Sequence, residues 1–138
     1  MAVFSKFDPF VAALAAKAHD LGSDVLAVAL TNAANPPVAA DAVLADLTQI
    51  AYTNLSGRIV TVASAVQVGG LFTLMVDPLI LTAGGGAVAA FRYVVLYNDT
   101  AAADELICFW DIGFEVTMAD TDTFDLNFDQ VNGVLTVG

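Results

Sequence analysis

The sequence has 138 residues, which suits one domain large enough to bury a core without disulfides or metals. Its 15 acidic residues outnumber 4 basic ones, and the net charge of −11 argues against binding to nucleic acid phosphates or to an anionic membrane. Only 14% of the residues are charged and 58% are hydrophobic, which indicates that other subunits cover part of the surface.

A helix is predicted near the N-terminus. Asp8 is a candidate N-cap, Pro9 fits the first turn of a helix, and Gly22 suits the left-handed residue that follows a helix. The arm before this helix carries three large apolar side chains, which are costly to leave in water. They either cover the sheet of their own subunit or dock on a neighbouring subunit, so they form the candidate assembly interface. These residues are Val3, Phe4 and Phe7.

The segments after residue 22 have the composition and spacing of β-strands. Turn-forming residues separate them, including Pro36-Pro37, Gly84-Gly85-Gly86 and an Asn132-Gly133 pair that is a typical hairpin signal. A bend at an edge position is expected at Pro78. The expected strands cover residues 24–31, 58–68, 71–82, 88–97, 106–113, 115–118, 124–129 and 134–137.

Residues 59–76 carry no charged side chain, and this length is at the lower limit for a helix that spans a membrane. However, Gly69-Gly70 interrupts the run, and its β-branched residues alternate with smaller or polar ones. We therefore expect two strands and a turn in this region, and no membrane span.

About eight strands with no helix between them predict a mainly β fold, an antiparallel β-sandwich or jelly roll with one N-terminal helix. Residues 42–52 fit either a helix or a strand. We expect the arm and helix to occupy residues 1–22 and the β-sandwich to occupy residues 23–138, together forming one compact domain.

Few side chains suit catalysis or metal binding. His19 is the only histidine, and its expected place in the last helical turn favours a role at the helix end, because no second histidine can complete a metal pair. Cys108 is the only cysteine and lies in an apolar run, which favours a buried thiol over a nucleophile. We expect no enzymatic activity, no catalytic residue, no cofactor and no metal.

Two further segments invite a ligand-binding interpretation. The acidic stretch 120–129 offers carboxylates of the kind that Ca²⁺ prefers, but its spacing does not match the helical calcium loop. Large apolar residues alternate with acidic ones over 124–129, which indicates the solvent face of a strand instead. Trp110, beside Phe109 and Asp111, could stack against a sugar, although a tryptophan in the core of a sandwich is the more common arrangement.

Five strings of the sequence carry a resemblance to known proteins: ALTN (29–32), VLADLTQIA (43–51), FRYVVLYNDT (91–100), FWDIG (109–113) and FDLNFDQVNGVLTV (124–137). In this order, after an N-terminal FSKF arm and helix, they resemble small virion structural proteins of tailed bacteriophages. The resemblance covers most of the chain, and it implies a β-sandwich like that of the decoration or cement proteins that stud capsids. Residues 113–115 (GFE) depart from it, because the group tends to be more polar here, which suggests a contact specific to this virus.

Composition and resemblance together predict a non-enzymatic virion structural protein. The first hypothesis is a capsid decoration or cement protein that stabilises the shell through contacts between subunits and capsomers. Its expected partners are the major capsid protein and copies of itself in a homo-oligomer, with no nucleic acid and no membrane. Its expected location is the virion, assembled in the host cytoplasm. The alternatives are a tail or fibre component and a carbohydrate- or receptor-binding module.

Overall fold

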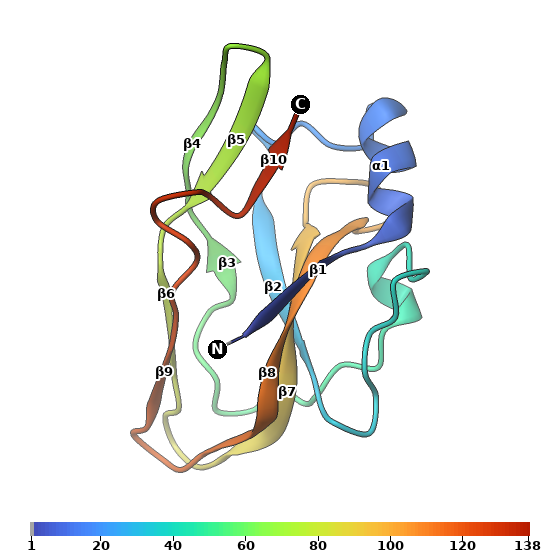
Figure 1. The fold of residues 1–138 in the computed structure, drawn as a ribbon. Coiled ribbons are helices and arrows are strands. Elements are labelled where there is room, and N and C mark those ends of the chain that lie inside the picture. Colours follow the sequence, from blue (N-terminus) through green and yellow to red (C-terminus); the bar gives the residue numbers. More distant parts are fainter. Residues whose placement is uncertain (1) are drawn as a thin grey trace.

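Strands account for most of the regular structure (Figure 1). The computed structural model describes residues 2–138, and over this range ten strands form three antiparallel sheets beside one α-helix. The expected mainly β, antiparallel fold with an N-terminal helix is therefore confirmed. The elements are β1 (Val3–Lys6), α1 (Asp8–Ala15), β2 (Leu26–Thr31), the 3-10 helix η1 (Leu44–Asp46), β3 (Ile59–Val60), β4 (Val62–Val68), β5 (Leu71–Val76), β6 (Leu79–Thr82), β7 (Val88–Asn98), β8 (Leu106–Met118), β9 (Thr123–Leu126) and β10 (Leu135–Val137).

The largest sheet has five strands in the order β1-β8-β7-β2-β3. Every residue of β2 is buried, as its uninterrupted apolar run suggests. β3 pairs only with the first two residues of β2, and the segment before β3 covers the rest of that edge. There the Leu30 amide donates to the Tyr52 hydroxyl at 2.9 Å, and the Leu30 carbonyl accepts from the Ile50 amide at 3.0 Å. This edge of the sheet is thus closed to further strands.

The two smaller sheets lie on the other side of the core (Figure 1). β5 is followed by β6 across Asp77-Pro78, so the single strand expected over 71–82 is two strands with a break at the proline. β4 and β10 flank β5, and β9 pairs with β6. Phe91 of β7 meets Phe124 of β9 edge to face, with ring centroids 5.5 Å apart, so the layers share one core.

α1 is shorter than the sequence predicts. Phe7, not Asp8, occupies the N-cap position, and Lys17 takes the left-handed conformation (φ 71°) that was expected at Gly22. The chain then makes a separate turn, in which the Asp20 carboxylate accepts from the Gly22 amide at 3.2 Å. Such local bonds from a side chain compete with the helical ladder, and they explain why the predicted helix end at Gly22 is wrong.

The Asn132-Gly133 pair does not form the predicted hairpin, because β9 pairs with β6 whereas β10 pairs with β5. Its turn instead brings the chain onto β5, and the Val134 amide donates to the Leu74 carbonyl at 2.7 Å. Gly133 has φ 85°, and a Cβ there would lie 2.7 Å from the Leu74 carbonyl oxygen. The glycine is needed for close approach as well as for backbone conformation.

Candidate interaction surfaces

The N-terminal arm belongs to the sheet of its own subunit. As β1, it pairs antiparallel with β8, and the Phe7 amide donates to the Ile107 carbonyl at 3.3 Å. Phe7 is fully buried and its ring lies 4.8 Å from that of Phe109. Val3 and Phe4 remain 64% and 43% exposed. The candidate assembly interface is therefore divided: Phe7 is part of the core, and only Val3 and Phe4 can meet a neighbouring subunit.

The hairpin of β4 and β5 projects beyond the end of the other strands (Figure 1). Its turn, Gly69-Gly70, has both residues at positive φ, and the hairpin is the expected outcome for the uncharged run 59–76. Within residues 2–138, no helix combines the length and apolar character needed to cross a bilayer.

One face of this hairpin carries exposed apolar side chains. Val66 and Val68 are two positions apart on β4, and Val68 pairs with Leu71 across the turn, so the three side chains share a face. They are 54%, 77% and 46% exposed. We call these three residues the hairpin patch. The sequence signal for it was the absence of charge between Arg58 and Asp77, which did not show that the segment would project.

A groove of about 350 Å³ lies between β8 and the β9 segment. Trp110 and Phe114 from one side, and Phe124 and Phe128 from the other, provide its aromatic lining. Trp110 is partly buried, with the Phe4 and Phe128 rings 5.8 and 5.3 Å away. This tryptophan is thus neither a wholly buried core residue nor a free stacking platform. We call this site the aromatic groove.

Three polar residues complete the aromatic groove: Asp125, Asn127 and Asp129. Backbone amides of Val131 and Asn132 donate to Asp129 Oδ1 at 2.9 and 2.8 Å, and these bonds lower the pKa of Asp129. Asp125 and Asn127 are exposed, as predicted for the solvent face of a strand. Asp129 is therefore occupied in holding its own loop, whereas the neighbouring carboxylate at position 125 faces solvent.

A wide bulge in β8 places Phe114 at this groove. On β7, Phe91 pairs with Val116 and Tyr93 pairs with Asp111. The single β7 residue between Phe91 and Tyr93 therefore lies opposite four residues of β8. Gly113, within the bulge, has φ 98°.

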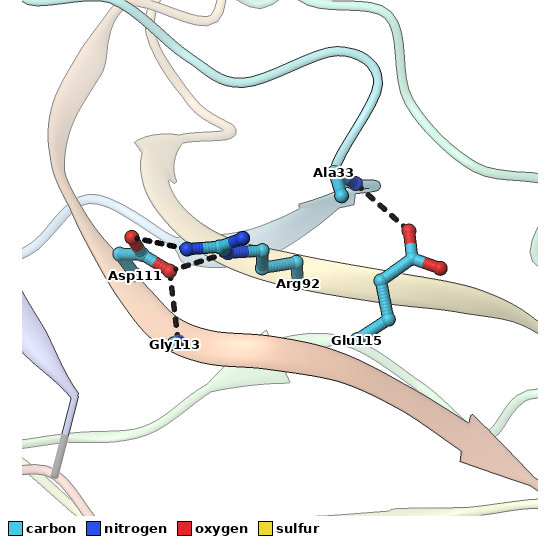
Figure 2. A network of polar contacts seen from close by, with 5 residues as sticks. All are labelled: Ala33, Arg92, Asp111, Gly113 and Glu115. Carbon is cyan, nitrogen blue, oxygen red and sulfur yellow. Dashed lines mark hydrogen bonds and ion pairs between the residues drawn. The ribbon is translucent and has the colours of Figure 1, made fainter.

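Polar contacts hold the bulge (Figure 2). Arg92 donates to Asp111 through Nε and Nη2 at 2.9 and 3.2 Å, and the Gly113 amide donates to Asp111 Oδ1 at 2.8 Å. Glu115 accepts from the Ala33 amide at 2.9 Å. The bond from Arg92 lowers the pKa of Asp111 and keeps this carboxylate ionised. Phe114 is left 63% exposed, so the bulge carries a large aromatic side chain at the surface.

His19 lies beyond the end of α1, so its predicted place in the last helical turn is wrong. It is buried against the Phe10 ring, and its Nδ1 lies 3.1 Å from Nδ2 of Asn98, which also donates to Asp24 at 2.7 Å. Burial lowers the pKa of His19, although the charges of Glu105 and Asp24 oppose this effect. The imidazole is a neutral structural group in this arrangement.

The remaining candidates for a chemical role are Cys108 and the acidic stretch 120–129, and their surroundings indicate a structural role instead. Cys108 is fully buried, and burial raises the pKa of its thiol. In the acidic stretch, Asp120 accepts from the Gly85 amide and Asp122 from the Ala119 amide. No group of three or more His, Cys, Asp or Glu side chains in the described part of the chain is placed to hold a metal ion.

Comparisons with known proteins give no assignment: no family model matches the chain, and no curated protein or solved structure matches it.

Proposed function

We propose that this chain is a non-enzymatic virion structural protein, a decoration or cement protein that stabilises a bacteriophage capsid. The resemblance of its strings supports this proposal, as does a fold that suits an antiparallel β-sandwich. Its partners would be the major capsid protein and further copies of itself. A protein that binds only the intact shell stabilises that shell by mass action and needs no reactive side chain.

The hairpin patch carries the proposal. Copies with a net charge of −11 repel one another, so they can associate most easily through a surface without carboxylates. Val66, Val68 and Leu71 provide such a surface, on a hairpin with no charge between Arg58 and Asp77.

The free energy gained by burying the hairpin patch suits many repeated contacts better than an isolated dimer. Full burial of a Val or Leu side chain contributes about 1.5–3 kcal/mol, so covering what is exposed of these three would contribute about 3–5 kcal/mol per copy. Association of two proteins costs about 4–15 kcal/mol because translational and rotational freedom is lost. A single contact is therefore weak, whereas several contacts on one particle reinforce one another.

The test combines particle composition with one substitution. Quantitative mass spectrometry of purified particles should find hundreds of copies of the chain, whereas a few copies would favour a tail or fibre component. Val68→Asp should lower the number of copies retained. Val131→Asp is the matched control, because it adds the same charge at a valine that is 86% exposed and outside the patch. Equal occupancy of both variants, or absence of the chain from particles, would refute the proposal.

A further inference from the structure

The aromatic groove has a distinctive combination of lining groups. Trp110, Phe114, Phe124 and Phe128 bring aromatic rings to it, and Asp125, Asn127 and Asp129 also line it. None of the described residues that line the groove is Lys, Arg or His. The aromatic rings and the carboxylates both attract positive charge, because a carboxylate is negatively charged and the face of an aromatic ring carries partial negative charge.

The same features argue against other small ligands. An anion would meet the carboxylates of Asp125 and Asp129 in a chain that is already strongly acidic. A neutral sugar ring needs a broad, open aromatic face, which Trp110 does not offer because it is partly buried near the rings of Phe4 and Phe128, whereas a narrow alkyl stem needs only the exposed part of the ring. A cationic group on an apolar stem matches both the rings and the acidic rim.

The bulge in β8 gives a geometric reason to expect a partner chain at the aromatic groove. Among residues 2–138, β1 pairs with β8 only as far as Asp111, and no described strand pairs with that side of the following part of β8. Phe114 is 63% exposed, and the ion pair of Arg92 with Asp111 lies at the bulge that carries it. The groove is therefore open at an edge where an extended chain can approach, and its outer wall is held in place.

We propose that the aromatic groove binds an arginine or lysine side chain on an extended segment of a partner protein. The stem of that side chain lies against Trp110 and Phe114, and its charged end meets Asp125. The identification of this partner with the capsid shell protein rests on the proposed function, whereas the chemistry of the groove does not.

Trp110 is the only tryptophan in the chain, so its fluorescence reports directly on the groove. The probe is the peptide acetyl-Val-Arg-Val-amide, compared with the same peptide carrying citrulline, which has a similar shape without the charge. We expect a saturable change in Trp110 fluorescence with the arginine peptide. Binding should be at least fivefold weaker with citrulline, and it should weaken as salt rises from 50 to 300 mM.

Two variants test the site itself. Asp125→Asn should weaken arginine-peptide binding at least threefold, whereas Asp99→Asn, which removes the same charge from an exposed position outside the groove, should not. Phe114→Ser should also weaken binding, and its exposed position should preserve the fold, as checked by thermal melting.

Equal binding of the arginine and citrulline peptides would overturn the proposal, as would absence of any response to the arginine peptide. Binding of maltose or N-acetylglucosamine in place of the peptide would identify a sugar site instead. The particle experiment with Val68→Asp is independent of these results. If it succeeds while the peptide fails, the decoration role stands and the groove proposal is wrong.

Discussion

Removal of the Phe7 side chain should destabilise the isolated protein strongly. Phe7 is fully buried at the junction of β1 and α1, and its ring lies 4.8 Å from that of Phe109. Truncating a buried phenylalanine to alanine costs about 3–5 kcal/mol. With an unfolding entropy of about 2.1 cal/mol/K per residue, this cost corresponds to a fall in Tm of about 10–17 °C for a chain of this length.

Phe4→Ala provides the matched control in the same N-terminal arm. Phe4 is 43% exposed and meets Trp110 edge to face, so its loss should cost only about 1–2 kcal/mol. Urea unfolding followed by circular dichroism gives both free energies, measured in the Val68→Asp background so that association through the hairpin patch does not contribute. A cost below 1 kcal/mol for Phe7→Ala would refute the docking of the arm in its own subunit. A Tm that rises with protein concentration in that background would show instead that the arm exchanges between copies.

Three other predictions concern buried groups and glycines. Cys108 should not react with a thiol reagent in the native protein and should react fully in denaturant, because the thiol is buried and burial raises its pKa. His19 has a lowered pKa in the folded state, so the unfolded chain takes up a proton first as the pH falls below about 6.5. The free energy of unfolding should therefore fall through this range in the wild type, and His19→Gln should lose less over the same range. Gly133→Ala should destabilise more than Gly113→Ala in urea unfolding, where the second should cost about 1–3 kcal/mol for its positive φ alone. Equal costs would show that the close approach of Leu74 to Gly133 is unimportant.

The strands of the core could be predicted because their signals are local. The continuous apolar run that became β2 is typical of a buried strand, and the alternation over 124–129 predicted β9, although β9 ends at Leu126 and not at residue 129. The break at Pro78 was also predictable, because proline cannot donate a ladder hydrogen bond.

The sequence-based predictions were wrong where a contact with a distant part of the chain overrides a local preference. Asn132-Gly133 has the composition of a hairpin turn, but β5 offers β10 a partner that local sequence cannot indicate. The end of α1 depends on the Asp20 turn and on the burial of His19 against Asn98, a residue far along the chain.

The candidate surfaces were only partly predictable for the same reason. The sequence identified Trp110 and the unusual Phe114, but nothing in it placed Phe124 and Phe128 opposite them. Arg92 and Asp111 have no local signal, because their pairing depends on the register of β7 with β8 and on the bulge that shifts it.

Added salt should strengthen binding at one surface and weaken it at the other, because charge opposes association through the hairpin patch and favours cation binding in the aromatic groove. The hairpin patch is uncharged, and copies that meet through it must overcome the repulsion between two bodies of charge −11. Added salt screens this repulsion and strengthens burial of apolar surface, so self-association should increase with salt. The aromatic groove attracts a cation through Asp125 and through the field of the whole acidic chain, and the same screening weakens that attraction. Sedimentation from 50 to 500 mM salt measures the first effect, and fluorescence titration of Trp110 measures the second. If both contacts weakened together, charge rather than apolar burial would drive the association of copies, and the hairpin patch would not be the contact.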